Sequence, residues 1–189
     1  GGARALRDAG VEVSFAADTT PFERVNEGWI KRARYGLPFV TAKVGVSLDS
    51  RVALQAGVRS NMTGPHGSVV TSILRRQVDA VVVGARTVTI DDPELTVRDP
   101  ASGELATVQP TRVILVGSQA PPSGSRVFAD GKAHTLVLAA RGDVVERWAE
   151  QLPPEVHVEH CDQAQGILGV LRVLGQRGIN EVLVEPGPR

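Results

Sequence analysis

The chain has 189 residues, of which 42% are hydrophobic and 22% charged, as in an ordinary globular protein. Its 21 basic and 21 acidic residues cancel, so the overall charge does not indicate nucleic acid or an anionic membrane as a partner. A single cysteine, Cys161, excludes an internal disulfide framework and a multi-cysteine zinc site, and we expect a reducing, cytoplasmic location. No apolar run approaches the roughly 20 residues that a membrane helix needs.

The N-terminal part predicts a short strand at residues 11–15 and a helix from Thr20 to about Tyr35. The letters TPFE at the start of this helix place proline at its first turn and glutamate close behind, a common helix start. Gly36 and Pro38 then interrupt the pattern. We therefore expect one domain boundary, with residues 1–36 belonging to the end of a preceding unit.

Residues 37–189 alternate between strand and helix patterns. Strands are predicted at 39–46, 80–84, 112–116, 134–139 and 181–185. Helices are predicted at 65–76, at 143–152 with Val144, Val145 and Trp148 inward, and around 167–174 with Gly178 as the stop. Such alternation indicates an α/β domain with a largely parallel central sheet.

The first of these strands carries a lysine among apolar residues. Alternation along PFVTAKVGV places Lys43 and Gly45 on one face of the strand. A flat ring could lie against Gly45 while the Lys43 ammonium reaches a polar group of a substrate. The alternative is a solvated lysine on an edge strand, which is where strand lysines are often found.

Further polar residues follow the carboxyl ends of predicted strands, where ligands bind in open α/β sheets. The pair Asp91 and Asp92 comes shortly after one strand, and Glu185 ends another. The aspartates before proline could simply initiate a turn. Arg75 and Arg98 could clamp a sugar phosphate or could be solvated. His157, His160 and Cys161 lack a third spaced ligand for metal and are interpreted as surface residues.

Five sequence blocks follow one another in the order TAKVGVSLDSRVA, MTG before LRRQ, DAVVVGARTVTIDDPELTVR, RVILVGS and EVLVEPGP. Together they resemble the reductase domain of the bifunctional riboflavin-biosynthesis deaminase/reductase. The resemblance implies a dihydrofolate reductase-like fold for residues 37–189 and the tail of a deaminase domain plus a connecting helix for residues 1–36. It also implies reduction of the ribosyl side chain of a 5-amino-6-(5-phosphoribosylamino)uracil by NADPH, in a protein expected to be a homodimer. We expect the chain to be a fragment, truncated at its C-terminal end.

The resemblance also assigns roles residue by residue. The catalytic residues that it implies are Lys43 and Asp91. The cofactor-binding residues that it implies are Gly45, Asn61, Thr87, Asp91, Ser118 and Gly187. The substrate-binding residues that it implies are Arg59, Arg75, Leu95, Arg98 and Glu185. No residue is assigned to metal, because the zinc motifs of the deaminase domain are absent and zinc is implied only for a part outside this chain.

The chain departs from the family pattern at three positions, two of them among these site residues. Many relatives carry tryptophan where Asn61 stands, a small hydroxyl residue where Arg59 stands, and glycine where Pro186 stands. These departures leave two alternatives beside the reductase. One is a paralogue that reduces another pteridine or pyrimidine, and the other is a non-catalytic binding or assembly module.

Overall fold

The computed structural model describes residues 2–55, 57–58, 62–161 and 165–187. Its helices are α1 (Gly2–Asp8), α2 (Thr20–Val25), α3 (Glu27–Tyr35), α4 (Pro65–Arg76), α5 (Ala85–Asp91), α6 (Arg126–Ala129), α7 (Asp143–Ala149) and α8 (Gly166–Gln176). Its strands are β1 (Phe39–Ala42), β2 (Ala80–Gly84), β3 (Thr111–Val116), β4 (Thr135–Ala139), β5 (His157–His160) and β6 (Glu181–Val184).

The six strands form one sheet in the order β1-β6-β2-β3-β4-β5, and every described pairing is parallel. The helices cover both faces, as a parallel sheet requires. One face packs α5, α6 and α7 through Val88, Phe128 and Trp148. The other packs α8 through Val170 and Leu174. The predicted α/β class with a largely parallel sheet is therefore confirmed.

The first strand is shorter than predicted. β1 ends at Ala42, and its described neighbour β6 ends at the paired residue Val184, so the ladder stops where its partner stops. Val44 and Val46, which lie within the predicted strand, are 44% and 51% exposed. The segment that carries Gly45 is therefore a loop, which leaves it free to form part of a cavity wall.

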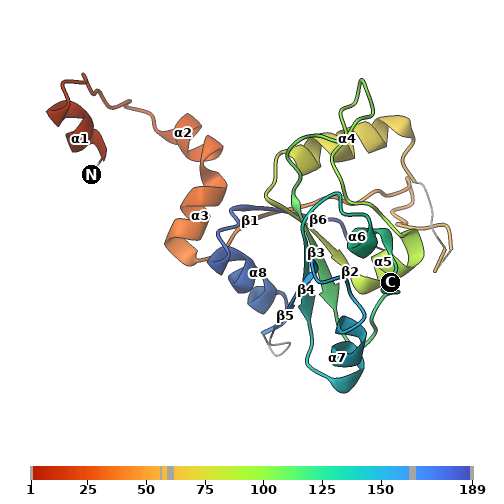
Figure 1. Cartoon of the computed structure of the whole chain (residues 1–189). Coiled ribbons are helices and arrows are strands. Elements are labelled where there is room, and N and C mark those ends of the chain that lie inside the picture. Colours follow the sequence, from red (N-terminus) through yellow and green to blue (C-terminus); the bar gives the residue numbers. More distant parts are fainter. Residues whose placement is uncertain (1, 56, 59–61, 162–164, 188–189) are drawn as a thin grey trace.

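The N-terminal part differs from the sequence prediction in two ways. Residues 11–15 form no strand, and the predicted single helix is divided at Asn26 into α2 and α3. The Asn26 side chain donates to the carbonyl of Phe22 at 2.8 Å, a local bond that competes with the helical pattern. Figure 1 shows α1 and α2 lying away from the sheet, while α3 contacts β1.

Two details in the second half of the chain also differ. The predicted helix 143–152 ends at Ala149, and Val144 is 62% exposed because it lies off the face that buries Val145 and Trp148. The residues from His157 to His160, interpreted as surface residues, form the edge strand β5 beside β4. Among the described helices, we find none that combines the length and the apolar run of a membrane span.

Candidate active site

The site lies where three neighbouring strands end. The N–H of Lys43 donates to the carbonyl of Val184 at 3.0 Å, and the N–H of Glu185 donates to that of Val82 at 3.0 Å. These bonds carry Lys43 and Glu185 one residue past β1 and β6, at the carboxyl edge of the sheet. Ligands bind at this edge in open α/β sheets, because the loops diverge there.

A cavity of about 330 Å³ opens at this edge and brings most of the predicted residues together. We call it the active cavity. Its predicted site residues are Lys43, Gly45, Arg75, Thr87, Asp91, Leu95, Glu185 and Gly187. Thr71 of α4 also lines the active cavity and was not among the predicted site residues. It lies four residues before Arg75 on the same helix face, and this spacing indicates that both side chains point to one place.

Arg75 and Glu185 form a two-pronged ion pair in the wall of the active cavity. Arg75 Nε lies 2.7 Å from Glu185 Oε1, and Nη2 lies 2.9 Å from Oε2. The third nitrogen, Nη1, donates to the carbonyl of Thr96 at 3.1 Å. The two charged side chains are only 16% and 15% exposed. Arg75 therefore already has strong partners in the protein, and a ligand would meet the pair rather than a bare cation.

Lys43 and Asp91 differ from the Arg75–Glu185 ion pair. Neither side chain makes an ion pair or a hydrogen bond with another described residue, although both line the active cavity. Asp91 is the last residue of α5, and Thr87 lies one turn before it on the same face. The ammonium and the carboxylate can therefore both hydrogen-bond a ligand.

Two predicted glycines, Gly45 and Gly187, lie where other parts of the chain come close to the backbone. A Cβ atom at Gly187 would lie 2.3 Å from Thr87 Oγ1, so only glycine fits there without a shift. At Gly45, which lines the active cavity, a Cβ would come within 3.4 Å of the Thr63 methyl. Gly187 therefore lets the chain after β6 pack closely against Thr87 of α5, and Gly45 presents backbone without a side chain to the active cavity.

The aspartate pair divides into two roles. Asp92 ends α5 in the left-handed conformation, with φ of 40°, and accepts hydrogen bonds from the Arg126 backbone N–H at 2.8 Å and from its Nε at 3.1 Å. It therefore stabilises a turn, the alternative that the sequence left open, while Asp91 lines the active cavity.

Leu95, in the loop after α5, is a second residue with positive φ. It has φ of 55°, which costs a branched residue roughly 1–3 kcal/mol, yet it is only 2% exposed. Its packing in the core holds it in this conformation. Leu95 lines the active cavity and also an adjoining cavity that contains Arg98. Strain of this kind is concentrated at functional sites.

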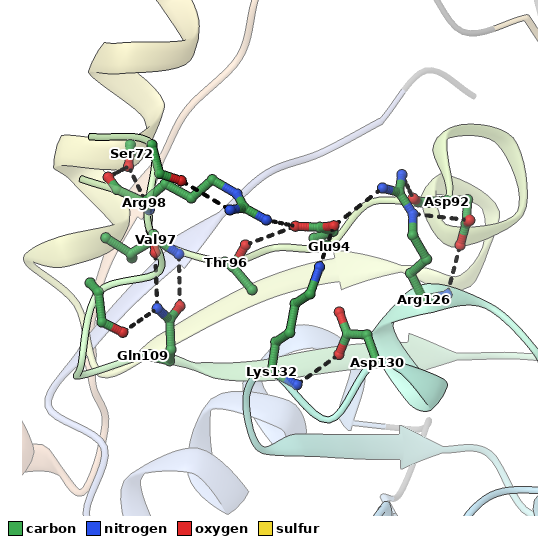
Figure 2. Close-up of polar contacts among 12 residues, drawn as sticks. Ser72, Asp92, Glu94, Thr96, Val97, Arg98, Gln109, Arg126, Asp130 and Lys132 are labelled. Carbon is green, nitrogen blue, oxygen red and sulfur yellow. Dashed lines mark hydrogen bonds and ion pairs between the residues drawn. The ribbon is translucent and has the colours of Figure 1, made fainter. Parts of the chain in front are cut away.

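Arg98 lies in the adjoining cavity and is held by Glu94 (Figure 2). Arg98 Nη2 is 2.8 Å from Glu94 Oε2, and Lys132 Nζ is 2.6 Å from Glu94 Oε1. Arg126 Nη1 lies 3.5 Å from the same carboxylate. Hydrogen bonds from Lys132 and Arg98 lower the pKa of Glu94 from 4.5 to about 2. Glu94 was not a predicted site residue, because its partner Lys132 is distant in the sequence.

The remaining predicted residues fall elsewhere. Ser118 lines a third cavity, on the other side of α5. Arg59 and Asn61 lie outside the described residues. The structure therefore brings eight predicted residues into the active cavity and places Arg98 beside it.

Comparison with known proteins agrees with this arrangement. Residues 38–189 match the family model described as the RibD C-terminal domain. The riboflavin biosynthesis protein RibD of Escherichia coli (strain K12) is 31% identical over 195 residues, covering 97% of this chain and 51% of the relative. That of Bacillus amyloliquefaciens is 33% identical over 184 residues, covering 96% of this chain and 48% of the relative. The chain thus spans about half the length of these curated relatives.

Solved structures give the same result. Acinetobacter baumannii RibD superposes with a TM-score of 0.81 at 28% identity, covering 98% of this chain and 50% of that protein. A diaminohydroxyphosphoribosylaminopyrimidine deaminase/5-amino-6-(5-phosphoribosylamino)uracil reductase of Thermotoga maritima superposes with a TM-score of 0.76 at 30% identity, covering 98% and 49%. These matches agree with the parallel sheet and with the cavity at its carboxyl edge. The chain therefore belongs to the RibD C-terminal domain family.

Proposed function

We propose that this chain is the reductase part of a riboflavin-biosynthesis protein, reducing the ribosyl side chain of 5-amino-6-(5-phosphoribosylamino)uracil to the ribityl form with NADPH. The observation that carries the proposal is the active cavity, in which the side chains of Lys43 and Asp91 have no partner among the described residues and Gly45 and Gly187 contribute bare backbone to the wall. The Thermotoga maritima relative, whose name includes this reductase activity, supports the substrate.

The residues of the active cavity would have different roles in the reaction. Gly45, Thr87 and Gly187 would hold the nicotinamide end of NADPH, which supplies the hydride. The Lys43 ammonium can hydrogen-bond the oxygen or nitrogen at the anomeric carbon and so polarise it toward reduction. Asp91 can accept a hydrogen bond or a proton in the same cavity.

The substrate phosphate and ribose would lie toward the adjoining cavity. Arg98 lines it, and Arg75 lines both cavities. Glu185 can accept a hydrogen bond from a ribose hydroxyl while it still pairs with Arg75, because each of its oxygens has a second lone pair. The pair therefore orients the sugar and is itself held in place by the cavity wall.

We also propose the organisation of the protein around this site. Residues 1–36 would be the end of a deaminase domain with its connecting helix, and residues 37–189 would belong to the reductase domain. This division is supported by the family match, which begins at residue 38, and by Gly36 in the left-handed conformation after α3. The complete protein would work as a homodimer in the cytoplasm, and light scattering of the purified protein would test the dimer.

The complete protein that carries this chain should oxidise NADPH when the phosphoribosylaminouracil is added, as followed by absorbance at the reduced nicotinamide band. Other pyrimidines and pteridines, tested at matched concentration, should support slower oxidation. Faster oxidation with one of them would favour the paralogue. Calorimetry with NADPH separates the remaining alternative, because a non-catalytic module would show neither binding nor oxidation.

A further inference from the structure

A cluster of charged side chains joins the adjoining cavity to the loop that precedes β4 (Figure 2). Its centre is the Glu94 carboxylate, which accepts hydrogen bonds from Arg98 Nη2 at 2.8 Å and from Lys132 Nζ at 2.6 Å. Arg126 Nη1 lies 3.5 Å from the same carboxylate. Glu94, Arg98 and Arg126 line the adjoining cavity, whereas Lys132 does not. Lys132 therefore contacts Glu94 from behind the cavity wall.

Glu94 orients the guanidinium of Arg98. Besides its bond to Glu94, Arg98 donates from Nη1 to the carbonyl of Gly103 at 3.0 Å. The Arg98 main chain is held as well, because its N–H donates to Ser72 Oγ at 3.2 Å and the Ser72 hydroxyl donates to the Arg98 carbonyl at 2.9 Å. The side-chain contacts with described residues use two of the five guanidinium N–H groups. The other N–H groups are available to a ligand in the adjoining cavity.

The buried Arg112 ties together the loops that carry Glu94 and Lys132. Its Nη1 donates to the Glu94 carbonyl at 3.3 Å and to Asp130 Oδ1 at 2.7 Å. The same Asp130 oxygen accepts a hydrogen bond from the Lys132 N–H at 3.0 Å. The side chains of Arg112 and Asp130 are only 2% and 9% exposed. A buried ion pair therefore holds Lys132 where its ammonium meets the Glu94 carboxylate.

The sign of the charge in this cluster depends on Lys132. Arg98 and Arg126 contribute two positive charges. Glu94 and Asp92, which is the second partner of Arg126, contribute two negative charges. The sum is zero without Lys132 and +1 with it. The lysine thus leaves the two arginines of the cavity wall with a positive charge that their carboxylate partners do not cancel.

The other charged residues that line the adjoining cavity are balanced in different ways. Arg75 is paired with Glu185. Backbone hydrogen bonds within its own turn, followed by the nearby charge of Arg76, lower the pKa of Asp99. Asp99 is therefore occupied by its turn and by a separate arginine. The excess positive charge of this wall lies at Arg98 and Arg126.

We propose that Glu94 and Lys132 are positioning residues for the sugar phosphate of the substrate. Glu94 orients Arg98, and Lys132 offsets the charge of Glu94, so that Arg98 and Arg126 receive a phosphate monoester. Without Lys132, the phosphate would meet an uncompensated carboxylate, which repels it. The proposal rests on the proposed reductase function, which assigns the substrate phosphate to this cavity, and it adds a lysine that acts through Glu94 without contacting the substrate.

The test is calorimetry on the complete protein with ribose 5-phosphate, the sugar phosphate part of the proposed substrate. Lys132→Met keeps an apolar side chain but removes the charge. It should weaken binding about tenfold, because Glu94 is then no longer offset. Lys132→Arg restores the charge and should bind within about threefold of the wild type.

Lys31→Met is the matched control, because Lys31 lies over the Phe39 ring and lines neither the active nor the adjoining cavity. It should bind ribose 5-phosphate as the wild type does. Urea unfolding checks that every variant is folded under the conditions of the titration, and Lys132→Gln replaces the methionine variant if that one is unfolded.

The Glu94→Gln background separates positioning from a purely structural role of Lys132. In this background Lys132→Met should change the affinity for ribose 5-phosphate less than about twofold, because the carboxylate that Lys132 offsets is absent. Three results overturn the inference. They are equal weakening by Lys132→Met in both backgrounds, wild-type affinity in Lys132→Met alone, and no binding of ribose 5-phosphate by the wild type.

Oxidation of NADPH with the aminouracil judges the proposed function separately. A protein that oxidises NADPH but binds ribose 5-phosphate independently of Lys132 refutes only the inference. A protein whose ribose 5-phosphate binding depends on Lys132 as expected, but which oxidises no NADPH, refutes the reductase function and retains the sugar phosphate site.

Discussion

The charged residues at the active cavity fall into two groups. Arg75 and Glu185 pair with each other, and Glu94 in the adjoining cavity is held by Arg98 and Lys132. Lys43 and Asp91 have no side-chain partner among the described residues. Charges that the protein satisfies maintain the shape of a site, whereas charges left without a protein partner are available to a ligand. Substitutions of the second group should therefore affect turnover, and substitutions of the first group should affect folding.

The largest effect is expected at Lys43. Lys43→Ala should lower turnover by about a hundredfold or more, because it removes the cation that polarises the reacting group. Its unfolding midpoint in urea should stay within error of the wild type, since no described contact is lost. Lys31→Ala is the control, because Lys31 lies over the Phe39 ring, 5.5 Å from its centroid, and does not line the active cavity. Unchanged turnover in Lys43→Ala would remove the basis of the comparison.

A second prediction concerns the satisfied pair. Glu185→Gln should lower the free energy of unfolding by about 2–3 kcal/mol and raise KM for the aminouracil, because Arg75 would remain largely buried without a carboxylate. Urea unfolding and steady-state kinetics would measure the two effects.

The double variant Arg75→Met with Glu185→Leu sharpens this prediction. It should recover much of the lost stability, since apolar residues of similar size replace a buried pair well, but it should not recover substrate binding. If Glu185→Gln unfolds at the same urea concentration as the wild type, the pair contributes nothing to the wall of the active cavity.

The smallest effect is expected at Glu94 and depends on pH. Because Lys132 and Arg98 lower its pKa from 4.5 to about 2, Glu94 stabilises the folded state fully above pH 4.5, and this contribution is lost as the pH falls toward 2. Partial exposure of the cluster reduces it to about 1–2 kcal/mol. Urea unfolding between pH 7 and pH 3 should show the wild type converging on Glu94→Gln as the pH falls.

Glu104→Gln serves as the control for this series, because the Glu104 side chain is exposed and forms no described ion pair. It should follow the wild type at every pH. A constant gap between wild type and Glu94→Gln across the whole range would contradict the lowered pKa.

Much of the fold followed from local patterns. The run AVVVG predicted β2 with its correct ends, and the pattern from Pro65 predicted α4 with its correct ends, because each element has one period and clear stops. The predicted ends of an element were wrong where they depend on contacts with other parts of the chain. β1 stops with β6, and α2 and α3 separate at Asn26. Such limits depend on a pairing partner or a side-chain bond that periodicity does not contain.

The α/β class follows from the strand and helix patterns, because these are local features of the sequence. The family resemblance of the ordered motifs implied the reductase site at Lys43, Asp91 and Glu185. The pairing of Glu185 with Arg75, and the absence of such a partner for Lys43 and Asp91 among the described residues, became visible in the fold alone. It also placed Lys132 against Glu94 and Arg147 in the same cavity as Ser118. These pairings join residues far apart in the chain, and only the packing of helices on the sheet brings them within contact distance.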